Sequence, residues 1–297
     1  MILITGAAGK TGKAVIRKLA EKESLVKALV FRPEQVHEIE ALGVKEVIVG
    51  DMCKSNFIQK AIQGVNSVYH ICPNMHPDEF AIGKQLIDEA KAVGITHFVY
   101  HSVLHPQIEV MPHHWNKMRV EELLFECGLP YTILQPAVYM QNILVNLGSI
   151  LETGRYTVPY AVESRISMVD LEDVAQVAVV VLTEVNNNGN QPLHAGATYE
   201  LVGTRPMSQT EVATILSHHL DRPVIAEQMS IDAWERRARS SGLSEYQVKT
   251  LIKMFAYYEK YGFWGNSHVL SWLLNRPTTS YDAFLKRVVK DRLHLAQ

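Results

Sequence analysis

Short apolar runs alternate with helical patterns through the first half of the chain. The apolar runs are continuous, as burial of a strand on both faces of a sheet requires. Between them, apolar residues recur at intervals of three and four, which predicts helices. Strands are expected at residues 2–5, 26–31, 46–49, 67–71, 97–101 and 131–135, and helices from 12 and at 34–42, 54–62, 80–93 and 116–127. This alternation predicts an α/β fold in which residues 1–150 form a Rossmann-type, doubly wound parallel sheet.

The second half of the chain has a different pattern. A helix at 171–184, a loop at 186–190 and a strand at 199–202 are followed by several aromatic-rich helices. Two of these helices begin with capping boxes, at Ser208 and at Ser244. We expect residues 151–297 to form a smaller, mostly helical substrate-side domain, with some chain returning to the core. Open α/β sheets bind ligands at the carboxyl ends of their strands, and we expect this domain to lean there.

Three glycines, Gly6, Gly9 and Gly12, follow the first strand at intervals of three and open the first helix. Glycine permits the sharp turn, the close approach of a pyrophosphate and tight helix–strand packing, while the helix N-terminus offers free N–H groups. Lys10 and Thr11 lie within the same turn. Such a junction can use glycine for turning alone, but the apolar strands on either side favour a dinucleotide-binding loop.

Arg32 stands at the end of the second strand, where NAD-preferring folds usually carry an acidic residue for the ribose 2′-hydroxyl. An arginine favours a 2′-phosphate, through charge-assisted bidentate hydrogen bonds. The alternative is a solvated arginine before Pro33. The sequence therefore predicts NADP(H) as the preferred cofactor and NAD(H) as the alternative.

Three further cofactor contacts are expected after the third and fourth strands. Asp51 follows the third strand, where a carboxylate can accept a hydrogen bond from an adenine amino group; its alternative role is as N-cap of the next helix. Pro73 and Asn74 follow the fourth strand, which would run past the ribose and the nicotinamide.

Composition and net charge argue against some classes of function. The 297 residues are 47% hydrophobic and 20% charged, with a formal net charge of -2, which gives no basic field for nucleic acid or a membrane surface. No apolar run approaches the ~18 residues of a membrane-spanning helix. Three cysteines without a CxxC pair, and no signal segment before the first strand, predict a reduced, cytoplasmic protein.

A set of motifs spread over nearly the whole chain resembles the extended and atypical short-chain dehydrogenase/reductases, and more narrowly their NmrA-like branch. The motifs are the glycine triplet, Ser102, the His113-x-x-x-Lys117-x-x-x-Glu121 segment, residues 128–136, Tyr139-x-x-Asn142, residues 168–175, residues 199–203 and the Pro277-Thr-Thr segment. The resemblance implies a Rossmann-type fold that binds NAD(P)(H), with Lys117 gripping the nicotinamide ribose. Members of this branch include NAD(P)H reductases of quinone type and proteins that sense NADP(H) without turnover.

His113 occupies the position of the tyrosine that transfers the proton in catalytically competent short-chain dehydrogenases. A histidine near its ordinary pKa of ~6.5 could donate a proton there, with Ser102 orienting the substrate carbonyl. The alternatives are a loop histidine without a role, and His114 as the acid. Without the tyrosine, nucleotide-sugar epimerisation is disfavoured.

Substrate contacts are expected from Gln135 and Tyr139 after the sixth strand, and from Phe80, which with Phe255 and Trp264 could wall an apolar cavity; aromatic residues at helical spacing pack in a core more often than they line a pocket. No metal is expected, because the histidine pairs 113–114 and 218–219 have i,i+1 spacing, which points side chains apart, and no carboxylate completes a ligand motif.

Two functions follow. The first is an NADP(H)-dependent oxidoreductase that transfers hydride to a small quinone- or enone-like acceptor. The second is a non-catalytic NADP(H) sensor that acts through a regulatory protein partner.

Overall fold

The computed structural model describes residues 1–186 and 191–295, so the loop predicted at 186–190 lies almost wholly outside the described residues. A seven-stranded sheet runs in the order β10-β6-β5-β4-β1-β2-β3. The pairs β1–β2, β1–β4, β2–β3, β4–β5 and β5–β6 are parallel, which confirms the predicted doubly wound sheet. The strands are β1 (Ile2–Ile4), β2 (Val26–Val30), β3 (Glu46–Val49), β4 (Ser67–His70), β5 (His97–His101), β6 (Tyr131–Pro136) and β10 (Ala197–Leu201).

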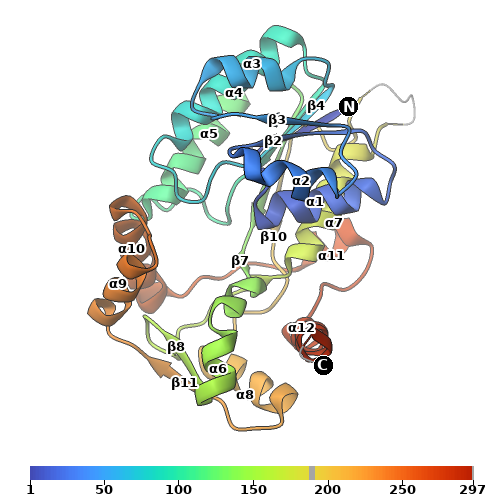
Figure 1. Cartoon of the computed structure of the whole chain (residues 1–297). Coiled ribbons are helices and arrows are strands. Elements are labelled where there is room, and N and C mark those ends of the chain that lie inside the picture. The colour runs from blue at the N-terminus through green and yellow to red at the C-terminus, as the bar shows by residue number, and fades with distance from the viewer. Residues whose placement is uncertain (187–190, 296–297) are drawn as a thin grey trace. The chain divides into compact units, whose positions relative to one another are not determined.

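Helices cover both faces of this sheet, as Figure 1 shows, because each parallel connection must cross over. One face carries α3, α4 and α5, whose apolar residues pack with the strands into one core cluster. The other face carries α1 and α2. The helices of this part are α1 (Lys10–Ala20), the 3-10 turn η1 (Pro33–Gln35), α2 (Val36–Glu40), α3 (Ser55–Ile62), α4 (Glu79–Val93), α5 (Pro112–Cys127) and α7 (Leu171–Thr183).

Several helix starts differ from the sequence prediction, among them that of α1, which begins at Lys10 and not at residue 12. The helix expected at 116 begins four residues earlier, at Pro112, which stands at the first helical position where its missing N–H costs nothing. His113 is therefore part of a helix and not of a loop. The helix after β3 begins at Ser55, with Lys54 at its N-cap and no side-chain cap. Asp51 accepts a hydrogen bond from the backbone N–H of Cys53 at 2.9 Å, so it shapes the preceding turn and does not cap the helix.

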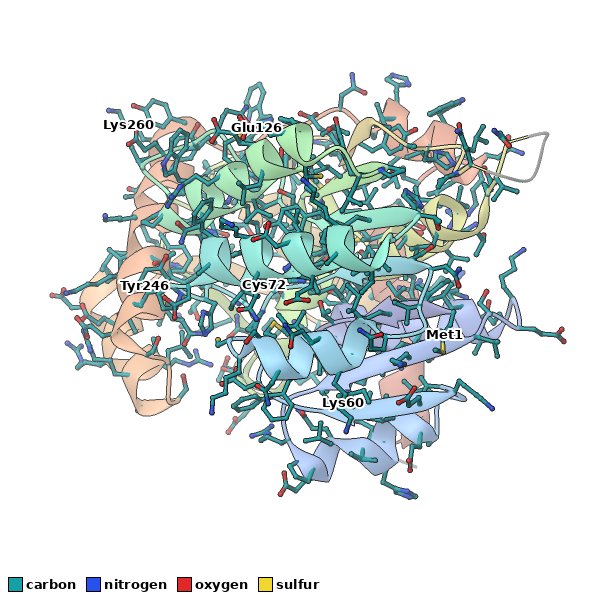
Figure 2. All side chains as sticks on the ribbon, turned by 90° about the horizontal axis from the view of Figure 1, so that it is seen from above. Met1, Lys60, Cys72, Glu126, Tyr246 and Lys260 are labelled. Atoms are coloured by element: carbon teal, nitrogen blue, oxygen red, sulfur yellow. The ribbon has the colours of Figure 1, made fainter. Side chains whose placement is uncertain are left out.

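The chain divides into two compact units. The first comprises residues 1–135 and 174–199, and the second residues 136–173 and 200–297. The first unit thus includes most of α7 and the start of β10, and the division expected at residue 150 falls inside the second unit. Side chains of Lys60 and Glu126 stand exposed on the outer helices of the first unit, whereas Cys72 is buried (Figure 2).

The second unit is mostly helical. Both predicted capping boxes are present: the Ser208 hydroxyl accepts from the N–H of Glu211, and the Ser244 hydroxyl from that of Gln247. Its two small sheets are β11–β8 and β7–β9. The elements are β7 (Val138–Tyr139), η2 (Met140–Val145), α6 (Leu147–Thr153), β8 (Arg155–Val158), β9 (Met168–Val169), α8 (Gln209–Leu220), β11 (Ile225–Gln228), α9 (Ile231–Ser240), α10 (Glu245–Tyr261), α11 (His268–Leu274) and α12 (Tyr281–Leu295).

Two fully buried carboxylates hold the second unit's C-terminal segments. Asp173 accepts a 2.7 Å bond from Arg276 and bonds from the N–H and hydroxyl of Thr279. Asp170 accepts a 2.6 Å bond from Arg287 of α12. A buried charge is tolerated only when it is paired and hydrogen-bonded, and both are. The motifs at 168–175 and at Pro277-Thr-Thr are therefore two halves of one structural contact.

Within the described ranges, no helix combines the length and the apolar character needed to cross a membrane.

Candidate functional site

The loop between β1 and α1 leaves no room for side chains at two of the three glycines. Gly6 has a φ of +58°, and a Cβ there would lie 2.8 Å from the carbonyl oxygen of Ile71. At Gly12 a Cβ would lie 2.6 Å from the carbonyl oxygen of Gly6. Both obstacles are backbone atoms, which cannot rotate away. The loop is therefore a close backbone turn, and its shape requires glycine.

The first turn of α1 has the properties of an anion-binding site. Gly9 is its N-cap, no side chain caps the helix, and the first turn contains no acidic residue. Lys10 is exposed at the first helical position, and Thr11 beside it is buried. Unpaired N–H groups and the positive end of the helix dipole favour a phosphate at such an end.

The loop opens at the position where the strand order reverses. β1 lies between β2 and β4, and chain connections leave it in opposite directions. Thr5 joins the carboxyl ends of β1 and β4: its hydroxyl lies 2.9 Å from Nδ1 of His70 and accepts a 2.9 Å bond from the N–H of Ile71. Open α/β sheets bind ligands in the crevice at this reversal.

The other expected cofactor contacts lie at neighbouring strand ends. Arg32 follows β2 and is exposed, and its N–H is held by the Gln35 side chain at 2.9 Å. Asp51 follows β3 and is half-buried, while Pro73 and Asn74 are exposed after β4. Because β4, β1, β2 and β3 are consecutive in the sheet, these residues share its carboxyl edge.

Lys117 is held by a buried carboxylate. Its ammonium group donates to Glu79 at 2.5 Å and to the carbonyl oxygen of His101 at 3.1 Å. Glu79 begins α4, is 1% exposed, and also accepts a 3.0 Å bond from the hydroxyl of Tyr100. The ammonium lies 5.3 Å from the centre of the Tyr100 ring. Lys117 is thus a fixed positive charge at the end of β5.

The positive charge of Lys117 stands among histidines that burial keeps neutral. Burial lowers the pKa of His70 and of His101 to about 3, and the charge of Lys117 contributes to both shifts. The ring of His70 stacks on Tyr100, with centroids 5.7 Å apart. Contacts therefore run without a break from Thr5 beside the glycine loop, through His70 and Tyr100, to Lys117.

His113 lies one turn before Lys117 on α5 and is 8% exposed. Burial, then the neighbouring His114 and Lys117, lowers its pKa to about 2. The premise that this imidazole titrates near 6.5 is therefore wrong, and His113 is a neutral ring at physiological pH. Its Nδ1 is buried and has no hydrogen-bond partner within the described part of the chain. His114, by contrast, lies 3.1 Å from the carbonyl oxygen of His105.

Ser102 belongs to a second buried network. Its hydroxyl donates a short hydrogen bond to Glu121, and the side chain of Gln135 donates to the same carboxylate at 2.9 and 3.0 Å. Glu121 is 2% exposed, and burial raises its pKa. Ser102, Glu121 and Gln135 therefore contact one another. Both predicted substrate-side residues, Ser102 and Gln135, are hydrogen-bonded to the Glu121 carboxylate.

The remaining predicted substrate contacts are divided between the two units. Phe80 is half-buried against the core of the first unit, and the guanidinium of Arg119 lies 3.8 Å above its ring. Phe255 packs in the second unit against Trp234, with ring centroids 4.8 Å apart. Trp264 is 56% exposed. Tyr139 is half-buried in β7, in the second unit.

Sequence reasoning missed Glu79 and Tyr100. Glu79 stands at the start of a helix, where an acidic residue is normally explained by its favourable interaction with the helix dipole. Tyr100 lies in a strand, where an aromatic residue normally packs in the core. Neither position carries a signal in the sequence that it would meet Lys117.

The comparisons with known proteins agree with this fold. The NmrA-like family model matches residues 1–280. The chain is 30% identical over 261 residues to an NAD(P)H azoreductase of Xenophilus azovorans, covering 86% of each chain. It is 27% identical to quinone oxidoreductase 2 of Escherichia coli, covering 94% of this chain and 96% of that protein.

Solved structures with a similar fold include the same quinone oxidoreductase. The NADPH complex of the Escherichia coli quinone oxidoreductase superposes over both whole chains with a TM-score of 0.82 at 27% identity. NmrA, a negative transcriptional regulator, shares the fold with a TM-score of 0.79 at 18% identity. The sheet order and the glycine loop define a protein of the Rossmann-type fold class. Within that class, the chain belongs to the NmrA-like family, as its motifs indicated.

Proposed function

We propose that this protein is an NADP(H)-dependent oxidoreductase that transfers hydride to a small quinone- or enone-like acceptor. The observation that carries the proposal is the β1–α1 loop, whose backbone leaves no space for a Cβ at Gly6 or Gly12 and which opens onto an uncapped helix N-terminus. The likeness to an NADPH-bound quinone oxidoreductase and to an NAD(P)H azoreductase supports this interpretation.

The residues at the carboxyl edge of the sheet are of the types that bind the parts of NADP(H). Gly6, Gly9, Lys10, Thr11 and Gly12 would hold the pyrophosphate with backbone N–H groups and one side-chain charge. The remaining contacts would be Arg32 to a 2′-phosphate, Asp51 to the adenine, Pro73 and Asn74 along the ribose, and Lys117 to the nicotinamide ribose. The cofactor would supply the hydride from C4 of its nicotinamide.

The protein's own side chains would orient the reactants without supplying a strong acid. Lys117, held by Glu79, would bind the nicotinamide ribose, and its positive charge would also favour an oxyanion that develops nearby during reduction. His113 is neutral, so its unpaired Nδ1 is suited to a hydrogen bond and not to proton release. Quinones need little acid catalysis, because aromatic delocalisation stabilises the reduced oxyanion. Ser102, Gln135, Tyr139 and Phe80 are the proposed substrate-side residues.

The test follows NADPH absorbance over a panel of quinones, enones and azo compounds, with Lys117→Ala, His113→Ala and His37→Ala. His37 is an exposed histidine of α2 that is not among the proposed site residues, and it serves as the matched control. We expect turnover of quinones, a loss of about a hundredfold or more in kcat/KM for Lys117→Ala, and no change for His37→Ala. Turnover that survives Lys117→Ala intact would contradict the assigned site.

A second function is favoured by the burial of His113, which lowers the pKa of this imidazole. A site without a titrating acid at this position is compatible with a dinucleotide sensor that binds NADP(H) and controls a protein partner. This alternative predicts NADPH binding, measured calorimetrically, with no NADPH consumption on any member of the panel. Quinone turnover that depends on Lys117 excludes it.

A further inference from the structure

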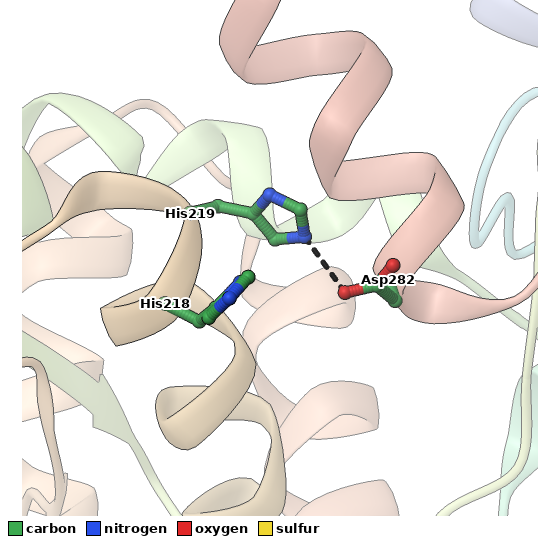
Figure 3. Close-up of side chains that lie close together, drawn as sticks. All are labelled: His218, His219 and Asp282. Atoms are coloured by element: carbon green, nitrogen blue, oxygen red, sulfur yellow. Dashed lines mark hydrogen bonds and ion pairs between the residues drawn. The ribbon is translucent and has the colours of Figure 1, made fainter.

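Two helices of the second unit bring three potential metal ligands together. His218 and His219 stand near the end of α8, and Asp282 stands in the first turn of α12 (Figure 3). Nε2 of His219 lies 2.9 Å from the Asp282 carboxylate. The rings of His218 and His219 are 5.3 Å apart, and one ligand atom from each of the three residues lies within 4.8 Å of the others.

We propose that His218, His219 and Asp282 form a zinc site. Two imidazole nitrogens and one carboxylate oxygen are a set that zinc accepts, and a water in the fourth position would complete a tetrahedron. Ligand atoms about 2.0–2.2 Å from zinc stand roughly 3.4 Å from one another in that geometry. The separation between His219 and Asp282, 2.9 Å, is near that value, and a side-chain rotation must bring the His218 nitrogen closer from within 4.8 Å.

The exposure of the cluster makes this rotation inexpensive and leaves the ion a path from solvent. His218 and Asp282 are exposed, while the side chain of His219 is only 12% exposed and anchors the group. The cluster is also built on two helices that pack against each other, not on loops. Such an ion would link α8 to α12 across 63 residues of sequence.

The i,i+1 spacing argued against a metal because adjacent residues on a helix diverge by about 100°. In the structure the two imidazoles stand nearly perpendicular, at 85°, with their edges close. The carboxylate that the sequence did not supply comes from the other helix. Neither the i,i+1 spacing of His218 and His219 nor the lack of a carboxylate near them in the sequence therefore excludes a metal site here.

The experiment uses the full chain without a purification tag, freed of metal with a chelator. Zinc binding is measured by calorimetry, and the thermal midpoint with and without zinc, for the wild type, His218→Ala and Asp282→Asn. His268→Ala, at a histidine of α11 in the same unit, is the matched control. Cobalt added to the same proteins reports tetrahedral coordination through its visible absorption.

We expect one zinc per chain, a zinc-dependent rise in the wild-type midpoint, and tetrahedral cobalt bands. His218→Ala and Asp282→Asn should each weaken zinc binding about tenfold or more, since even the loss of an outer-shell partner has that effect. The zinc-dependent shift is compared within each variant, so a general loss of stability does not mimic the result. Equal zinc affinity in the wild type and both variants, or an equal loss in His268→Ala, overturns the proposal and leaves an ordinary helix–helix ion pair.

Discussion

Replacing Glu79 by glutamine tests whether this carboxylate fixes Lys117. Glu79 is 1% exposed, and it accepts bonds from the Lys117 ammonium at 2.5 Å and from the Tyr100 hydroxyl at 3.0 Å. The Lys117 side chain is 15% exposed, so solvent screens the pair little. Glutamine keeps the size of the side chain and removes its charge.

The expected magnitude follows from the burial of the pair. Removing one partner of a buried ion pair leaves the other charge uncompensated and costs about 3–5 kcal/mol. The amide oxygen of the introduced glutamine can still accept one bond, so we place Glu79→Gln at about 2–3 kcal/mol. Replacing both partners removes both charges, so Glu79→Gln combined with Lys117→Met should cost less than the sum of the single changes, by about 1–3 kcal/mol.

Urea unfolding of the wild type, both single variants and the double variant measures this coupling, and NADPH binding is measured on the same four proteins. Glu79→Gln should also raise the NADPH dissociation constant, because Lys117 loses its anchor. Glu89→Gln, at another acidic residue of the same helix, is the matched control. Strictly additive stabilities, or unchanged NADPH binding in Glu79→Gln, would refute the reasoning.

Three further predictions concern single sites. Arg32→Glu should weaken NADPH roughly ten- to a hundredfold and NADH only slightly, because it removes charged hydrogen bonds to a 2′-phosphate; equal losses in titrations with both cofactors would remove that assignment. The folded pKa of His113 is about 2 against 6.5 unfolded, so the buried neutral ring carries no pH-dependent penalty above pH 6.5 and destabilises the fold increasingly as pH falls from 6.5 toward 2. The difference in unfolding free energy between wild type and His113→Gln should therefore change by about 1.4 kcal/mol per pH unit below pH 6; a constant difference contradicts the buried neutral state. Asp173→Ala should lower the free energy of unfolding by about 2–4 kcal/mol, since it removes the buried carboxylate that Arg276 and Thr279 both contact, whereas the exposed Asp232→Ala should change it by less than about 0.5 kcal/mol.

The strand and helix pattern was predictable because burial on both faces leaves a local record. The strand at 97–101 agrees with the predicted bounds and is buried along its whole length. The strand at 46–49 also agrees, although it is the half-exposed strand at the edge of the sheet. The errors fall at helix starts. Pro112 begins α5 four residues before the expected start because proline fits the first helical position, and Asp51 forms a turn before α3 instead of its cap.

The sequence by itself determined the strands of the sheet, the glycine loop and the family, because each is recognised from short local patterns in the chain. Spacing places Gly6, Gly9 and Gly12 at one strand–helix junction, and periodicity assigns the strands around it. Only the tertiary structure decided which partners the site residues have and which of these residues are charged. Glu79 meets Lys117 from a helix 38 residues away, and His113 is neutral because packing removes it from water. Desolvation and ion pairing depend on which distant segments come together, and no local pattern in this sequence records that.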